Sequence, residues 1–257
     1  MANSLSLGRH HFLHVDIRRV PMLQSIVWIR RGWDDLRHSP AASLAHGALI
    51  TALGGVLLVL GSSHPYLVAA AISGYLLVGP IMTTGLCELS RRRAAGEPTG
   101  FDESLASITR NPEGLLYFGA VLAVLAAAWF VVSGLVLQSS LHSQAPTLAE
   151  ALWGSVTDAV SRPQILAYIG SGAVLAAIVF ALSVVAVPLI IDRHASALDA
   201  MWISIKVTFW NLPAMIVWAA LIVVLTMIGF APFLFGMIVV APLLGHATWH
   251  AYRDLVA

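Results

Sequence analysis

The chain has 257 residues, of which 58% are hydrophobic and only 11% are charged, and its formal net charge is +1. Together with a mean hydropathy of +0.84, this excludes an ordinary soluble domain, in which about a quarter of the residues are charged. The single cysteine excludes an intramolecular disulfide. We expect no nucleic-acid partner.

The first 24 residues are predicted to form a polar tail, followed by a membrane domain over 25–257. Residues 1–20 contain arginine and histidine side chains and lack the apolar stretch of a secretory signal. A cleaved leader is therefore not expected.

Six long apolar runs without charge predict an all-α, polytopic membrane protein. A bilayer core of about 30 Å needs about 20 helical residues. Lipid cannot satisfy free backbone amides, and the runs lack strand alternation, so helices are expected. The last two runs meet at Phe230–Pro232 without a polar loop, and we expect a tight hairpin there. The six spans lie at about 42–61, 65–87, 115–137, 165–191, 213–230 and 231–249.

Basic residues predict the orientation. Of the 14 Lys and Arg side chains, only Arg162 falls in a loop on the opposite side from the others. Because cytoplasmic loops are enriched in Lys and Arg, both termini are predicted to be cytoplasmic.

A short amphipathic segment and a proline precede each pair of spans. The prolines are Pro40, Pro112 and Pro213, and the apolar face of the first segment is assigned to residues 26, 29, 33 and 36. The residue before a proline avoids helical geometry, so each proline is expected to separate a surface helix from the span that follows it. The six spans are then predicted to form three hairpins, each preceded by an interfacial helix. This internal repeat indicates either duplication of a stable hairpin or a threefold arrangement around a central path.

Tryptophans and arginines at the cytoplasmic interface are predicted to anchor the chain in lipid. The predicted anchors are Trp28, Trp33, Arg30, Arg31, Arg91, Arg92, Arg93, Trp202 and Trp249.

His246 and His250 share one face of the last helix, because they are four residues apart. With His46 and Cys87 at similar depth, they are the candidate ligands for a metal ion or haem, and Glu88 and Asp254 are candidates for the carboxylates behind them. Hydrogen bonding of interfacial histidines within the fold is the alternative. No pattern assembles a nucleophile with a base, so no catalytic residue is assigned.

The leading hypothesis is a non-enzymatic accessory or assembly factor that binds lipid, other membrane proteins or a second copy of itself. A small-solute transporter or channel is the alternative, as is a metal- or haem-handling protein. A transporter predicts a midplane cavity lined by Ser73, Thr83, Thr84, Ser133, Ser183 or Thr226.

Three stretches carry a resemblance to a known family: residues 28–36, residues 76–92 and the closing residues 242–255. They resemble an uncharacterised family of predicted bacterial integral membrane proteins, over about residues 25–256. The resemblance implies a location in the bacterial inner membrane and brings no assigned activity.

Overall fold

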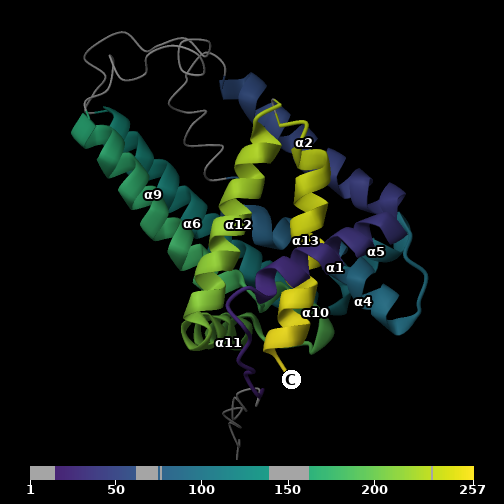
Figure 1. Ribbon diagram of the computed structural model, residues 1–257. Helices are drawn as coiled ribbons and strands as arrows, with labels where there is room; N and C mark the ends of the chain where they lie inside the picture. Colours follow the sequence, from purple (N-terminus) through teal and green to yellow (C-terminus); the bar gives the residue numbers. More distant parts are fainter. Residues whose placement is uncertain (1–14, 62–74, 76, 139–161, 233) are drawn as a thin grey trace, which may run out of the picture.

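The computed structural model describes residues 15–61, 75, 77–138, 162–232 and 234–257. Every named element in this part of the chain is an α-helix (Figure 1). The helices are α1 (Gln24–His38), α2 (Pro40–Gly61), α4 (Thr84–Ala95), α5 (Phe101–Arg110), α6 (Pro112–Gln138), α9 (Arg162–Ser183), α10 (Ala186–Asp192), α11 (Ala197–Trp210), α12 (Leu212–Phe230) and α13 (Met237–Leu255).

Among the described residues, four segments are long and apolar enough to cross a membrane, and they correspond to the first, third, fourth and fifth predicted spans. The second predicted span, 65–87, lies largely outside the described residues. The sixth was expected at 231–249, but α13 runs from Met237 to Leu255. The four segments are Pro40–Val59, Pro112–Ser133, Ile165–Asp192 and Leu212–Phe230.

Prolines place the helix boundaries. Ser39 and Asn111 precede Pro40 and Pro112 and have non-helical φ/ψ of −126°/62° and −151°/73°, because the proline ring disfavours helical geometry in the preceding residue. Proline itself is tolerated in the first turn, where its missing N–H has no acceptor within the helix. Surface helix and span are therefore separate elements.

Pro188 has a different effect, because it lies inside an apolar segment. It cannot donate to the carbonyl of Val184, four residues earlier, and its ring clashes there. The helix accordingly breaks at Val184–Val185, between α9 and α10. α10 is almost completely buried and contacts α4 and α11.

α13 is the central helix of the bundle, contacting α1, α2, α4 and α12. Glycines permit these close approaches. A Cβ added at Gly32 of α1 would lie 2.8 Å from the backbone N of Ala247, and one added at Gly47 of α2 would lie 2.0 Å from the carbonyl O of Ile238. Both helices therefore pack directly on the backbone of α13.

The two ends of the described chain meet. Ile17 forms an isolated antiparallel bridge with Val256, and Asn211 accepts a hydrogen bond from the backbone N–H of Val20 at 3.0 Å. Residues from Val15 onward thus pack on the helices, although they belong to the stretch expected as a polar tail. Both ends lie on the same side of any membrane that the helices cross.

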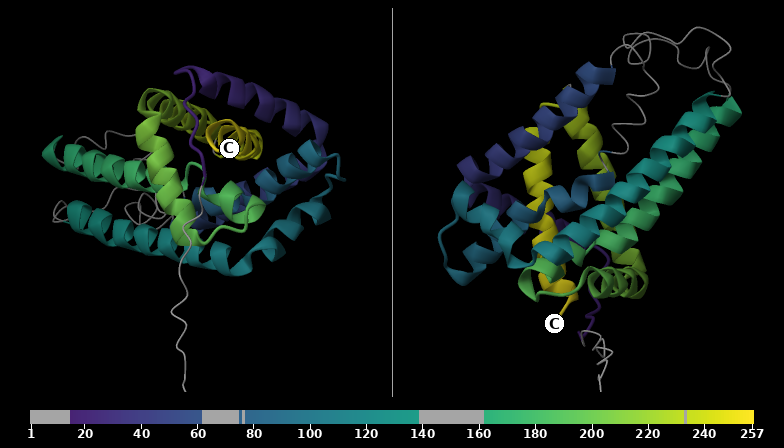
Figure 2. Two further views of the ribbon diagram at one scale, coloured as in Figure 1. Left: turned by 90° about the horizontal axis from the view of Figure 1, so that it is seen from below. Right: turned by 180° about the vertical axis from the view of Figure 1, so that it is seen from behind.

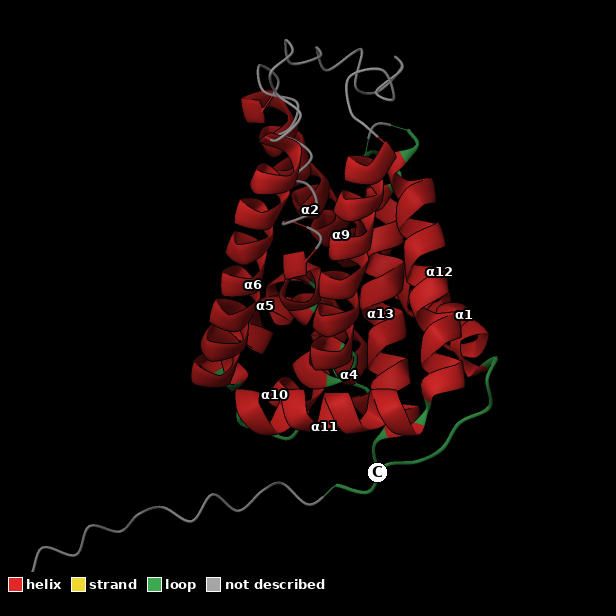
Figure 3. Cartoon of the chain, turned by 90° about the vertical axis from the view of Figure 1, so that its left-hand side faces the viewer, coloured by secondary structure: helices red, strands yellow, loops and turns green. Residues whose placement is uncertain are grey.

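The helices α6 and α9 run side by side and lean away from the α12–α13 pair (Figures 1 and 2). α11 lies across the lower end of the bundle, crosswise to α12 (Figure 3). Large apolar side chains on α2, α6, α9 and α12 point outward. Such a surface fits lipid rather than water.

Candidate functional site

A buried polar cluster lies where α1, α2 and α4 meet α13. Its centre is His246, which is fully buried. The Nε2 atom of His246 lies 2.9 Å from Ser43 Oγ of α2, and its Nδ1 atom lies 2.8 Å from Ser90 Oγ of α4. Three helices, α2, α4 and α13, are thus joined through His246.

Asp35 of α1 continues the cluster toward the surface. It accepts hydrogen bonds from Ser90 Oγ, from Arg93 Nη1 at 2.6 Å and from His250 Nε2 at 2.9 Å. Burial raises the pKa of Asp35, but the hydrogen bonds from His250 and Ser90 outweigh it and leave the pKa below the ordinary value of 3.8. Asp35 is therefore an ionised carboxylate at neutral pH.

The carboxylate that binds His250 is Asp35, whereas Glu88 and Asp254 were the two carboxylates expected beside the histidines. Glu88 is fully buried, but it binds Arg91 Nε at 2.8 Å and Arg92 Nε at 3.0 Å, with Arg110 Nη1 at 3.8 Å. Glu88 therefore joins α4 to α5, and Asp35 occupies the place next to His250.

Asp254 likewise binds groups other than the histidines. It accepts hydrogen bonds from Gln24 Nε2 at 2.7 Å and Trp28 Nε1 at 2.9 Å, and it pairs with Arg31 at 3.0 Å. These three donors belong to successive turns of α1. Asp254 therefore fastens α1 to the end of α13.

The other two candidate ligands, His46 and Cys87, bind groups outside the cluster. His46 Nε2 lies 2.8 Å from Ser104 Oγ of α5, and Cys87 donates to the carbonyl of Gly245 with an S–O distance of 3.6 Å. Among the described residues, no group of three or more His, Cys, Asp or Glu side chains could hold a metal ion. Both ring nitrogens of His246 are already engaged by serine hydroxyls. The metal or haem site stays a prediction, which elemental analysis and the absorption spectrum of the purified protein test.

The expected lipid anchors divide into two groups. Trp33 and Trp202 are exposed, but Trp28 and Trp249 are buried in the core. Trp28 stacks edge-on against Trp218, with ring centroids 5.7 Å apart. Arg30 and Arg31 are also exposed, although Arg31 pairs with Asp254. Arg91, Arg92 and Arg93 all form ion pairs with carboxylates of the fold.

Sequence reasoning missed Asp35, Ser43 and Ser90. The buried face of α1 consists of Ser25, Trp28, Gly32, Asp35 and Leu36, whereas Ile26 and Trp33, two of the four residues of the predicted apolar face, point outward. Lipid accepts apolar side chains, so the polar face of a membrane-bound helix can be the one that packs inside. The spacing of Trp28 and Asp35, two turns apart, is the signal that could have placed Asp35 inward.

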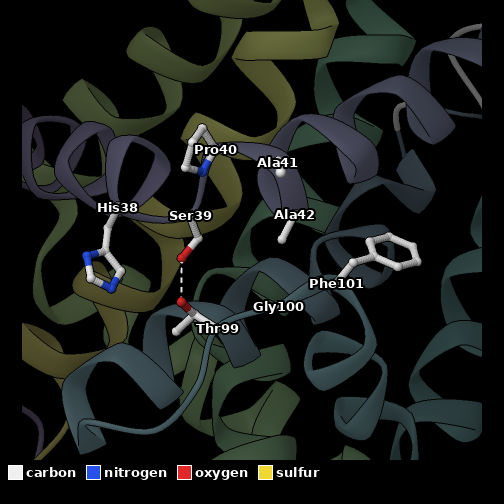
Figure 4. A pocket seen from close by; sticks show the side chains of 8 residues that line it. All are labelled: His38, Ser39, Pro40, Ala41, Ala42, Thr99, Gly100 and Phe101. Atoms are coloured by element: carbon white, nitrogen blue, oxygen red, sulfur yellow. Dashed lines mark hydrogen bonds between the residues drawn. The ribbon is translucent and has the colours of Figure 1, made fainter.

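A shallow pocket opens beside the cluster, at the junction of α1 and α2 with the loop before α5 (Figure 4). Ser39 Oγ donates to Thr99 Oγ1 across it at 2.6 Å. Its lining is His38, Ser39, Pro40, Ala41, Ala42, Thr99, Gly100 and Phe101. Small and apolar groups dominate, so the pocket offers few polar groups to orient a ligand.

The chain matches one known family. Residues 67–192 match the model of DUF2189, described as a predicted integral membrane protein. The matched residues make up slightly less than half of the chain. Comparison with curated proteins and with solved structures finds no match. The expected resemblance to an uncharacterised family of predicted integral membrane proteins is confirmed.

The DUF2189 segment contributes only part of the polar cluster. Ser90 and Arg93 lie inside it, whereas Asp35, His246 and His250 lie in the flanking parts of the chain. The similarity to DUF2189 and the four apolar segments of the described residues together indicate an integral membrane protein with several apolar helices.

Proposed function

We propose that this chain is a non-enzymatic accessory or assembly factor of the bacterial inner membrane, which binds lipid or other membrane proteins. The ionisable groups described above are bonded to one another inside the fold. The exposed side chains of α2, α6, α9 and α12 are mainly apolar, and α11 exposes aromatic side chains beside Lys206. Such a surface is suited to binding lipid or other membrane proteins rather than to catalysis.

The outward face of α11 carries the proposal. Trp202, Phe209 and Trp210 are exposed on it, and Lys206 Nζ lies 5.3 Å from the centre of the Trp202 ring. Exposed tryptophan beside a cation is typical of the boundary between lipid tails and headgroups. The opposite face of α11 is buried, so the helix presents these aromatic side chains to the membrane or to a partner within it.

The proposal includes an orientation and a topology. We infer that the lower end, with α11 and both chain ends, is cytoplasmic, because the predicted loops on that side contain nearly all of the Lys and Arg residues. We further infer the six spans expected from the sequence, of which the second, 65–87, lies largely outside the described residues and the sixth, 231–249, falls largely in α13, which makes three hairpins. The helices α1, α5 and α11 then lie near the cytoplasmic interface, one before each hairpin.

The hydroxyl groups weigh against the transporter alternative. Thr83 and Thr84 donate to the carbonyls of Pro80 and Ile81. Ser133 donates to the carbonyl of Phe130, and Ser183 to that of Val179. Hydroxyls that satisfy backbone carbonyls three or four residues earlier in the chain are not free to bind a solute. Ser73 lies outside the described residues.

Purification in mild detergent, with crosslinking and mass spectrometry of retained lipid, tests the proposal. We expect a reproducible protein partner or retained anionic lipid, reduced in the double variant Trp202→Ala/Lys206→Gln. The control is Val223→Ala, which removes an exposed apolar side chain from the membrane face of α12. Recovery of a lone species, with no partner and no dependence on lipid, would contradict the proposal.

A further inference from the structure

The hydrogen atoms of the buried cluster can be assigned by counting donors and acceptors. Asp35 is ionised, so it only accepts. The single proton of Ser90 Oγ must therefore go to Asp35, and Ser90 Oγ can only accept from His246 Nδ1. His246 then carries its proton on Nδ1.

The remaining nitrogen of His246 completes the chain. A charged imidazole is disfavoured at a site without solvent exposure, so Nε2 is unprotonated and accepts from Ser43 Oγ. All hydrogen bonds from Ser43 through His246 and Ser90 then point one way, toward the carboxylate.

We propose that Asp35, Ser90, His246 and Ser43 form a one-directional hydrogen-bond relay through which α1 sets the tautomer of His246 and the direction of the Ser43 hydroxyl. The relay reports the docking of α1 to the contact between α2 and α13, because each member has only one way to satisfy its neighbours. Movement of α1, by a bound partner or by lipid, removes the acceptor and allows every bond to reverse. This inference does not depend on the proposed function.

Other charged and titratable groups also face the relay. Asp35 also faces Arg93 of α4 and His250 of α13, and His46 of α2 lies near enough to interact electrostatically with His246. Arg93 has no acceptor capacity, so it requires an oxygen atom at position 35. This requirement makes the result of one substitution predictable.

In Asp35→Asn, Arg93 keeps the amide oxygen, and the amide NH₂ faces Ser90 and His250. Ser90 then accepts from Asn and donates to His246 Nδ1, so the His246 proton moves to Nε2 and is donated to Ser43. ¹⁵N NMR of imidazole-labelled protein in detergent at neutral pH distinguishes the two tautomers. The His246 signals are assigned by their loss in His246→Gln.

We expect Nδ1–H in the wild type, Nε2–H in Asp35→Asn and Nδ1–H in the matched control Asp254→Asn. The control removes a carboxylate from the other contact between α1 and α13 but keeps Asp35, the acceptor that Ser90 faces. Nε2–H or protonation of both nitrogens in the wild type would overturn the relay, as would an identical response to the two Asp→Asn changes. If Asp35→Asn does not fold, Ser90→Ala replaces it, because it removes the acceptor of Nδ1–H. Persistence of Nδ1–H in that variant would equally overturn the relay.

Discussion

The arginine run 91–93 neutralises two buried carboxylates at once. Arg91 and Arg92 bind Glu88, whereas Arg93 turns to Asp35 on a different helix. A carboxylate without solvent contact is stable only with such partners, because desolvation of an isolated charge costs several kcal/mol. The basic run, which from sequence resembles a lipid anchor, thus also holds α4 against α1.

Glu88→Gln is expected to destabilise the protein strongly. It removes the carboxylate from a buried ion pair, and breaking such a pair typically costs about 3–5 kcal/mol. Glu97→Gln is the matched control, since Glu97 also pairs with Arg91, but its side chain is 41% exposed. Exposed pairs contribute about 0–1 kcal/mol. Thermal melting in detergent measures both, and equal losses for the two variants would refute the structural role of Glu88.

Acidification is expected to destabilise the attachment of α1 to α13. Burial raises the pKa of Asp254, but hydrogen bonds from Gln24, Trp28 and Arg31 outweigh it, so the pKa lies below 3.8. A carboxyl with a lowered folded-state pKa stabilises the fold above its unfolded-state pKa, and this contribution is lost as the pH falls through the folded-state value. The pKa of Asp35 is shifted in the same direction.

The melting temperature should therefore be level above about pH 5 and fall below about pH 4. Asp254→Asn should lower the melting temperature at neutral pH and flatten the acidic decline. Asp34→Asn, which changes an exposed carboxyl on the same helix, should keep the wild-type profile. An unchanged acidic decline in Asp254→Asn would show that other groups cause it.

At the scale of helices, Gly47 of α2 and Pro242 of α13 together permit a close contact at the carbonyl of Ile238. Pro242 has no N–H to donate to the carbonyl of Ile238, one turn earlier in α13. This carbonyl oxygen lies 2.0 Å from the position of a Cβ at Gly47. The α2 backbone therefore approaches the carbonyl closely enough for a Cα–H···O contact.

Gly47→Ala should separate α2 from α13, because the new methyl group meets backbone that cannot move aside. Overpacking of this kind costs about 1–3 kcal/mol. Gly55→Ala, two turns further along α2, meets nothing within 4 Å and is the matched control. Melting temperatures in detergent compare the two, and equal stability would exclude the close packing at Gly47.

The sequence predicted the four apolar segments that are found among the described residues, because a long apolar run without charge has few alternatives in a membrane. It also predicted the boundaries at Pro40 and Pro112, where local sterics decide. The pairing of His250 with Asp35 could not be predicted, since 215 residues separate them and periodicity within one helix says nothing about the helix opposite. The buried face of α1 could not be predicted for the related reason that its apolar face can contact lipid while its other face packs inside.

At the scale of the whole molecule, the two chain ends meet at one end of the bundle. The backbone N–H of Arg18 donates to the carbonyl of Leu255 at 2.9 Å, and that of Ala257 donates to Asp16 at 2.9 Å. α11 crosses the same end (Figure 3). If this end is cytoplasmic, the relay from Asp35 to Ser43 begins at the cytoplasmic side and leads into the bundle.

Cysteine accessibility in intact cells tests this orientation most directly. Single cysteines replace the exposed Ser196, before α11, or the exposed Arg162, at the start of α9. The background is Cys87→Ser, which keeps a donor for the carbonyl of Gly245. We predict that an impermeant thiol reagent labels the variant at Arg162 in intact cells and the variant at Ser196 only after the membrane is opened. Labelling at Ser196 in intact cells, without labelling at Arg162, would contradict the account.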